Sequence, residues 1–155
     1  MALSIKPYIE NKERIHLIGI GGVSMNSLAE LLLSRGVPVS GSDRLKTDVT
    51  ARLESLGAKV TYEHKAENVE GASLIVRTAA VHDDNPEVVR AHELGIPVME
   101  RAEAWGHLMR DYDNVVCLAG THGKTTSTSM MTLMTMEAGL DPTVMVGSNL
   151  PAIGG

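Results

Sequence analysis

Apolar residues in this chain occur in short runs that alternate with stretches of helical spacing. Residues 14–20 (RIHLIGI) form a short apolar run that contains glycine near its end, which is typical of a buried parallel strand. In the stretch that follows, apolar side chains recur at the spacing of one helix face, at Met25, Leu28, Ala29 and Leu32. The segment PVSGSD after this helix is expected to be the next strand.

The same alternation continues to about residue 110. Helices are predicted at 48–56, 85–94 and 101–110, and strands at 59–62, 73–77 and 96–99. Asn85 followed by Pro86 is a typical helix start. Because strands that alternate with helices pair in parallel, the pattern predicts an α/β fold with a Rossmann-like doubly wound sheet.

A different pattern begins near Asn114. VVCLAG is predicted to be a strand, THGKT a glycine loop, the residues to Ala138 a long helix, and TVMV another strand. Of the 14 basic and 19 acidic residues, only Lys124, Glu137 and Asp141 lie in 114–155. Since a solvent-facing helix normally has a charged side, the uncharged TTSTSMMTLMTM is expected to be enclosed. We therefore predict one domain in residues 1–113 and, in 114–155, the first strand, glycine loop, helix and strand of a truncated second domain.

The composition favours a soluble globular protein. The chain has 155 residues, of which 43% are apolar and 21% charged. No apolar run approaches the ~20 residues of a membrane-spanning helix, the first residues do not resemble a secretory signal, and the single Cys117 cannot form an internal disulfide. We therefore expect a cytoplasmic protein with no membrane partner. The net charge of -5, the lack of basic clusters and the absence of Phe argue against nucleic acid as a partner.

The first candidate site is the glycine turn GIGGVS, residues 19–24, between the first strand and the helix after it. Gly19 permits the tight turn, while Gly21 and Gly22 let backbone N–H groups approach a diphosphate at the helix start. Ser24 takes the place of the third glycine and keeps a small side chain there. Asp43, at the end of the next strand, is expected to accept hydrogen bonds from ribose hydroxyls. The alternative is a tight turn with a purely structural role.

The second candidate site is the loop of residues 120–126, GTHGKTT. It has the form of a shortened phosphate-binding loop, because only Thr121 and His122 separate its first glycine from GKT. Backbone N–H groups would cradle phosphates, Lys124 would neutralise their charge, and the Thr125 hydroxyl would bind Mg²⁺. A lone lysine in an uncharged segment is costly to desolvate unless an anion meets it. The alternative is a glycine-rich turn with a surface lysine.

Other reactive side chains are interpreted structurally. Cys117 lies in an apolar run and is expected to be a core thiol, and the methionines of the long helix are expected to be core packing. The six histidines show no pair at metal-ligand spacing, so a zinc site is not expected. For His122, contact with a ligand and a hydrogen bond within the loop are both open. Trp105 is expected to anchor the core or the domain joint.

Two nucleotide sites in one short chain indicate a reaction between a nucleoside triphosphate and a nucleotide-carrying substrate. The runs IHLIGIGGVSM, VSGSD, HKAENV, DNPEVVRAHELGIPVMERAE, AGTHGKTTSTSMM and EAGLDPT resemble the amino-terminal part of the Mur ligases. The resemblance extends from about Arg14 through nearly the whole chain, and the GTHGKTT form of the loop is fairly specific to this family. The IGIGG run fits the alanine-adding branch better than the branch that recycles murein tripeptide.

This resemblance implies an ATP-dependent ligase of peptidoglycan synthesis that adds L-alanine to UDP-N-acetylmuramate through an acyl phosphate. It implies that the UDP part is held by Gly19, Gly21, Gly22, Ser24 and Met25 at the diphosphate, Ser42 and Asp43 on the uridine side, and Thr78, Ala79 and Ala80 on the opposite wall. It implies that ATP is held by Gly120, Thr121, His122, Gly123, Lys124, Thr125 and Thr126, with Lys124 catalytic and Thr125 a Mg²⁺ ligand. His64 and Asn68 match a further family motif.

The resemblance also implies acidic metal ligands and an amino-acid-binding domain that lie outside these residues. The chain by itself is therefore expected to bind the UDP-sugar without turnover. The main alternative, based on the glycine turn alone, is an NAD(P)- or nucleotide-binding regulatory module with no ligase activity. A P-loop ATPase or kinase is a further alternative, weakened because the sequence contains no later strand that could hold a water-activating acid.

Overall fold

A computed structural model describes residues 3–148 and 150–153 of the protein. The chain divides into two compact units, Met1–Asp113 and Asn114–Gly155. Within the described part of the chain, every helix is too short or too polar to cross a membrane.

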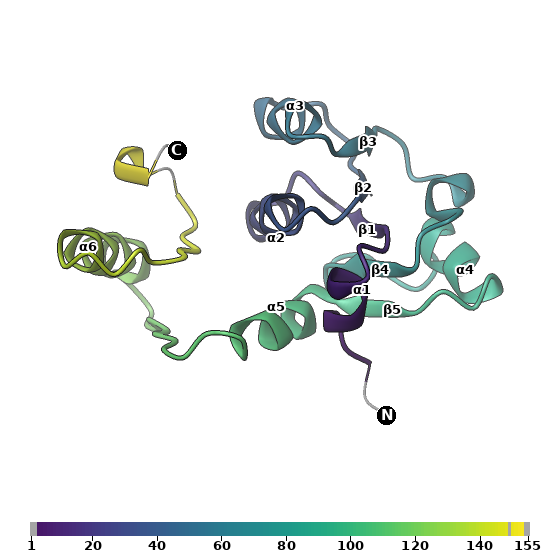
Figure 1. Ribbon diagram of the computed structural model, residues 1–155. Helices are drawn as coiled ribbons and strands as arrows, with labels where there is room; N and C mark the ends of the chain where they lie inside the picture. Colours follow the sequence, from purple (N-terminus) through teal and green to yellow (C-terminus); the bar gives the residue numbers. More distant parts are fainter. Residues whose placement is uncertain (1–2, 149, 154–155) are drawn as a thin grey trace. The chain divides into compact units, whose positions relative to one another are not determined.

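The first unit is built on a five-stranded parallel sheet with the strand order β3-β2-β1-β4-β5 (Figure 1). Its strands are β1 (Ile15–Ile18), β2 (Val39–Ser42), β3 (Lys59–Thr61), β4 (Leu74–Arg77) and β5 (Val98–Glu100). Its helices are α1 (Lys6–Glu10), α2 (Val23–Ser34), α3 (Asp48–Ser55), the 3-10 helix η1 (Ala66–Val69), α4 (Pro86–Glu93) and α5 (Arg101–Met109). The predicted α/β fold is confirmed, and only the short α1 and η1 lack a sequence prediction.

Helices cover both faces of this sheet (Figure 1). Ile15 and Leu17 of β1 belong to the larger core, which buries apolar residues of α1, α2, α3 and α5. Ile18 belongs to a smaller core beneath η1 and α4. Because successive strand residues point to opposite faces, His16 lies on the same face as Ile18. All four residues of β1 are buried, as expected for a central strand of a doubly wound sheet.

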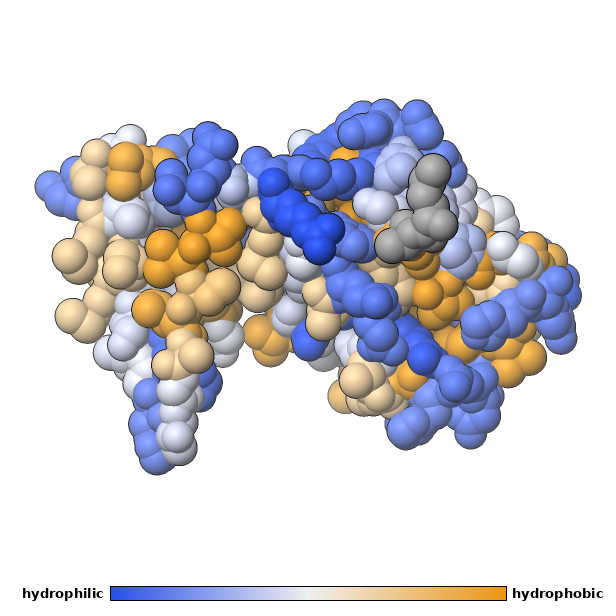
Figure 2. All heavy atoms as spheres, turned by 90° about the horizontal axis from the view of Figure 1, so that it is seen from below, coloured by the Kyte–Doolittle hydropathy of each residue, from blue (hydrophilic) through white to orange (hydrophobic). Residues whose placement is uncertain are grey.

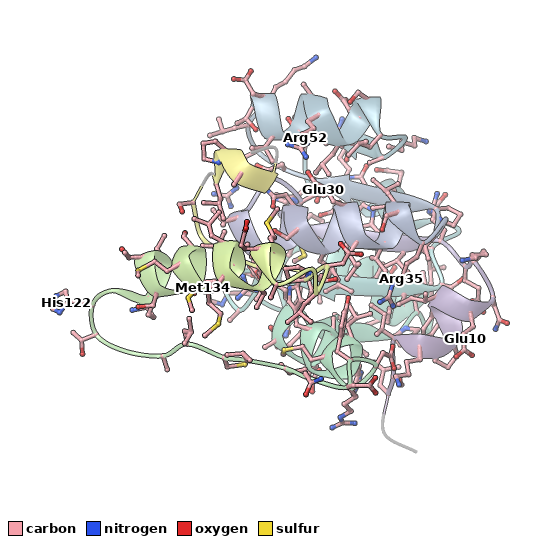
Figure 3. The ribbon with its side chains drawn as sticks, turned by 60° about the vertical axis from the view of Figure 1, so that its left-hand side comes forward. Glu10, Glu30, Arg35, Arg52, His122 and Met134 are labelled. Carbon is pink, nitrogen blue, oxygen red and sulfur yellow. The ribbon has the colours of Figure 1, made fainter. Side chains whose placement is uncertain are left out.

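Local contacts fix where the helices begin and how they pack. The Asn85 side chain accepts a hydrogen bond from the Glu87 N–H at 2.9 Å, so the predicted cap of α4 is confirmed. Arg52 of α3 pairs with Glu30 of α2 at 3.2 Å, which joins two helices on the same face (Figure 3). Trp105 of α5 packs against the larger core and donates to the Ser24 carbonyl at 3.2 Å, so it anchors the core of the first unit.

The second unit contains α6 (Lys124–Glu137) and the 3-10 helix η2 (Pro151–Ile153). The predicted long helix is confirmed. The predicted strands VVCLAG and TVMV are wrong, because neither 115–120 nor 143–146 is a strand in the structure. A strand forms only in a sheet, and the sheet found among the described residues consists of β1 to β5.

The surface of the second unit carries many apolar side chains (Figure 2). In α6, Met130 is 59% and Met134 66% exposed, and only Thr132 is buried. The expectation that this helix is enclosed is therefore not met within the described residues, and Cys117, expected in the core, is exposed. Apolar side chains gathered on a surface in this way are typical of a face that packs against further protein.

Candidate functional site

The order of the strands determines where a ligand can bind to the first unit. β1 and β4 are adjacent, with Ile18 opposite Arg77 at their carboxyl ends. The chain leaves β1 toward α2 on one face of the sheet and leaves β4 toward α4 on the other (Figure 1). Ligands of doubly wound sheets bind at the carboxyl ends of the strands where the connections diverge in this way. The two predicted walls, the glycine turn and residues 78–80, therefore lie on either side of such a point.

The glycine turn is fastened to the end of β2. The N–H groups of Gly19 and Ile20 both donate to the Ser42 carbonyl, at 2.8 and 3.0 Å. Gly19 has a φ of +80°, which a residue with a side chain rarely adopts. Gly22 is the N-cap of α2, whose first turn contains no acidic residue. The start of α2 therefore favours an anion by its dipole and has no carboxylate of its own to oppose one.

Asp43 organises this turn rather than standing apart from it. Its Oδ2 accepts the N–H of Gly21 at 2.8 Å, and its Oδ1 accepts the N–H groups of Arg44 and Leu45 at 2.7 and 3.2 Å. The sequence predicts that Asp43 contacts the ribose or the uridine side of a ligand. In the structure, both carboxylate oxygens bind backbone N–H groups of the protein.

Two residues assigned to the UDP site point into the interior. The Met25 side chain is fully buried in the larger core, and its N–H donates to the Gly22 carbonyl at 2.8 Å. Ser42 is also fully buried, and its hydroxyl bonds to protein side chains. In the structure, apolar packing holds the side chain of Met25 and a polar cluster holds that of Ser42, and the contact of these two residues with the UDP part stays a prediction.

This polar cluster, which we call the Glu87 cluster, consists of Glu87 and the four side chains that contact its carboxylate, those of His16, Ser42, His64 and Asn68. Glu87 is fully buried, and its carboxylate has four partners. Oε1 is 3.2 Å from His16 Nε2 and accepts from Asn68 Nδ2 at 2.7 Å. Oε2 accepts from the Ser42 hydroxyl at 2.7 Å and lies 2.8 Å from His64 Nδ1. The structure thus gives the family-motif residues His64 and Asn68 a common partner.

The chemistry of the cluster keeps Glu87 ionised. Burial raises the pKa of Glu87, but the hydrogen bonds from His16, Ser42, Asn68 and His64 together outweigh burial and lower this pKa below its ordinary value. His16 Nδ1 lies 3.0 Å from the Ser40 hydroxyl, so a His16 with its proton on Nε2 can donate to Glu87 and accept from Ser40.

Glu87 and His16 are absent from the sequence predictions, although each left a signal. In α4 the buried residues are Glu87, Val88 and Ala91, so the acid lies on the apolar stripe of its helix. In β1, His16 interrupts an otherwise apolar strand. Polar residues at buried positions require partners, and here they partner one another.

The opposite wall is a short turn after β4. The Val81 N–H donates to the Thr78 carbonyl at 3.0 Å, while Ala79 and Ala80 are exposed. Arg77, at the end of β4, contacts both Glu100 of β5 and Asp83 of the following loop, at 3.0 and 2.5 Å. Arg77 thereby attaches this loop to the end of the sheet.

The second candidate site lies at the start of α6. Gly123 is its N-cap with a φ of +78°, and Lys124 is its first residue. The Lys124 ammonium donates to the carbonyls of Gly120 and Thr121 at 2.5 and 3.3 Å, so the lysine folds over the loop. Residues 120–126 are all exposed, and the His122 side chain points away from the rest of its unit (Figure 3).

The residues of this loop fit a phosphate group. The first turn of α6 has no acidic residue, so its N–H groups and Lys124 present only positive charge. The described residues contain no group of three or more His, Cys, Asp or Glu side chains that could hold a metal ion. Thr125, the second residue of α6, is exposed and carries a hydroxyl oxygen of the kind that Mg²⁺ prefers.

Comparison with known proteins identifies the family of this chain. The model of the Mur ligase family, catalytic domain, matches residues 14–113. The chain belongs to the Mur ligase family. Its relatives include the UDP-N-acetylmuramate–L-alanine ligases of Caldanaerobacter subterraneus subsp. tengcongensis, 50% identical over 95% of this chain and 32% of the relative, and of Alkaliphilus metalliredigens, 48% identical over 92% and 31%.

Solved structures of Mur ligases share the fold. The UDP-N-acetylmuramate-alanine ligase of Thermotoga maritima is 35% identical with a TM-score of 0.85, over 90% of this chain and 33% of that one. The UDP-N-acetylmuramate:L-alanyl-gamma-D-glutamyl-meso-diaminopimelate ligase from Neisseria meningitides is 30% identical with a TM-score of 0.84, over 92% and 45%. The chain spans about a third of the length of the curated relatives.

Proposed function

We propose that this chain is the amino-terminal part of an ATP-dependent ligase that joins L-alanine to UDP-N-acetylmuramate through an acyl phosphate. The observation that carries the proposal is the extent of the similarity. Relatives with that enzyme name are 47 to 50% identical over 92 to 96% of the chain, so the similarity includes most of both units.

The UDP part of the substrate is assigned to residues 1–113. The glycine turn (Gly19, Gly21 and Gly22) and the first turn of α2 at Ser24 would receive the diphosphate, since the helix dipole favours an anion there. Asp43 would hold the glycine turn in shape through its bond to the Gly21 N–H. Thr78, Ala79 and Ala80 would form the opposite wall, where the exposed small side chains leave room for a ligand.

ATP is assigned to residues 120–126 of the second unit. Lys124 would exchange its bonds with the Gly120 and Thr121 carbonyls for phosphate oxygens and would stabilise charge on the group that is transferred. Thr125 would give a hydroxyl ligand to Mg²⁺, which supplies positive charge beside the phosphates when bound. We place the reaction in the cytoplasm, in keeping with a chain that has a single exposed cysteine.

Calorimetric titration of the purified chain with UDP-N-acetylmuramate tests the first assignment. NADH and ATP serve as control ligands under the same conditions. Saturable binding of the UDP-sugar, unaffected by NADH, is the expected result. Binding of NADH without competition from the UDP-sugar would overturn the proposal in favour of a dinucleotide-binding module.

A phosphate-release assay tests whether the chain alone can turn over. Because the relatives are about three times longer, we expect no ATP- and alanine-dependent phosphate release above that of the Lys124→Ala variant. Release that depends on L-alanine and is lost in Lys124→Ala would show that residues 1–155 suffice for the reaction.

A further inference from the structure

Ser42 connects the Glu87 cluster with the glycine turn. Its hydroxyl donates to Glu87 Oε2 at 2.7 Å on the α4 face of the sheet. Its carbonyl accepts the N–H groups of Gly19 and Ile20, which form the entrance to the glycine turn. The next residue, Asp43, accepts the Gly21 N–H. One dipeptide therefore carries three of the hydrogen bonds that shape the turn and one bond to Glu87.

Glu87 is well placed to fix that dipeptide. Its carboxylate receives hydrogen bonds from β1, from the end of β2, from the loop after β3 and from η1, through His16, Ser42, His64 and Asn68. Glu87 itself is held by the Asn85 cap at the start of α4. A fully buried, hydrogen-bonded carboxylate cannot rearrange without leaving polar groups unpaired, so the cluster is a rigid support.

We infer that Glu87 is a positioning residue for the diphosphate-binding glycine turn, and that it acts through the hydroxyl of Ser42 without touching the ligand. The part of this inference that concerns the ligand rests on the proposed function. The part that concerns the turn is independent of any ligand. His64 and Asn68, which also bond to Glu87, belong to the same support of the turn.

Amide hydrogen exchange of the unliganded chain tests the effect on the turn. Ser42→Ala removes only the hydroxyl that links β2 to Glu87, and Glu87→Ala removes the centre of the cluster. We expect each variant to accelerate exchange at Gly19 and Ile20 about tenfold relative to the Ile75 amide, since a hydrogen bond to a charged group is lost. The Ile75 amide donates to the Pro97 carbonyl between β4 and β5, so it corrects for any change in overall stability.

Two matched controls separate positioning from general loss of polar contacts. Ser40→Ala deletes a hydroxyl from the same strand and the same face, but that hydroxyl bonds to His16 and its residue does not hold the turn. Glu93→Ala removes an acid from the same helix, where it makes an exposed ion pair with Arg90. Both should leave the ratio of Gly19 to Ile75 exchange unchanged. Equal ratios in Ser42→Ala and Ser40→Ala would overturn the inference.

Calorimetry of the same variants tests the effect on the ligand. We expect Ser42→Ala and Glu87→Ala to raise the Kd for UDP-N-acetylmuramate about tenfold and Ser40→Ala to change it by no more than about twofold. Faster exchange at the turn with an unchanged Kd would overturn the substrate-positioning role. If the unmodified chain did not bind the UDP-sugar, the proposed function would fail, and the exchange ratios would still decide whether Glu87 positions the turn. Should Glu87→Ala not fold, Ser42→Ala carries both comparisons.

Discussion

Gly21 has almost no room for a side chain. A Cβ at this position would lie 2.8 Å from Asp43 Oδ2 and 3.1 Å from Thr50 Cγ2. Gly21 therefore allows the carboxylate of Asp43 to reach the backbone of the turn. Gly21 is required because Asp43, which follows β2, and Thr50 of α3 approach the turn closely, and spacing in the sequence does not reveal this approach.

Gly21→Ala is expected to lower the free energy of unfolding by about 1–3 kcal/mol, because the new methyl group must displace the Asp43 carboxylate. Urea denaturation measures this difference. Gly106→Ala is the control, since Gly106 lies in α5 with open space around it, and alanine there should be neutral or stabilise by about 0.5–1 kcal/mol. Equal stability of Gly21→Ala and the unmodified chain would contradict the geometry of the turn.

The lowered pKa of Glu87 predicts how the free energy of unfolding depends on pH. Its pKa in the folded chain lies below the ordinary value of 4.5, so the unfolded state binds the proton more tightly. The carboxylate therefore stabilises the fold fully above about pH 4.5, and this contribution is lost as the pH falls through the lower, folded pKa. Glu87→Gln should be less stable at neutral pH and should lose stability less steeply in acid. Denaturation at several pH values in the acid range measures how the free energy of unfolding falls with pH in Glu87→Gln and in the unmodified chain. The same dependence on pH in both would exclude this role for Glu87.

At the scale of elements, the start of α4 combines a structural and a functional task. The Asn85 cap fixes the first turn of the helix, and that turn delivers Glu87 to the polar cluster. The smaller core holds the rest of α4 through Val88 and Ala91. The position of one carboxylate is therefore determined by a cap on one side and by apolar packing on the other.

Asn85→Ala should lower the free energy of unfolding by about 1 kcal/mol, the usual effect of losing an N-cap side chain. Asn85→Asp keeps an oxygen that can accept the Glu87 N–H, so it should retain most of the stability. Thermal or urea unfolding of the two variants provides the comparison. Equal losses in both variants would mean that the cap is not the source of the effect.

At the scale of the whole molecule, the two units differ in how completely they bury apolar residues. The first unit encloses two cores, one on each face of its sheet. In the second unit, Met130, Leu133 and Met134 of α6 are exposed, and no sheet forms among the described residues of 114–155. A helix of 14 residues with so little packing is marginally stable by itself.

Limited proteolysis should therefore cleave within residues 114–155 well before it cleaves the first unit. The expected product is a resistant fragment that ends near Asp113, identified by mass spectrometry. Resistance of both units to the same protease concentration would show that 114–155 is more stable than its exposed apolar surface suggests.

The sequence supported the prediction of the first unit because each element there, apart from the short α1 and η1, carries its own signal. The period of the apolar residues and the Asn85-Pro86 start are local properties, and the structure confirms them. The strands expected at 115–120 and 143–146 failed because a strand depends on a partner elsewhere in the fold. The resemblance to the Mur ligases implied that Met25 faces the diphosphate, and helix geometry turns its side chain into the core.

The order of residues by itself determined the α/β class, the glycine turn, the phosphate-type loop and the resemblance to the Mur ligases, because these depend on near neighbours in the chain. Only the tertiary structure decided that Glu87 gathers His16, Ser42, His64 and Asn68, and that Asp43 binds the turn itself. These contacts join residues up to 71 positions apart. A buried carboxylate must find its donors wherever the fold brings them, and the parallel strand order brings them to one end of the sheet.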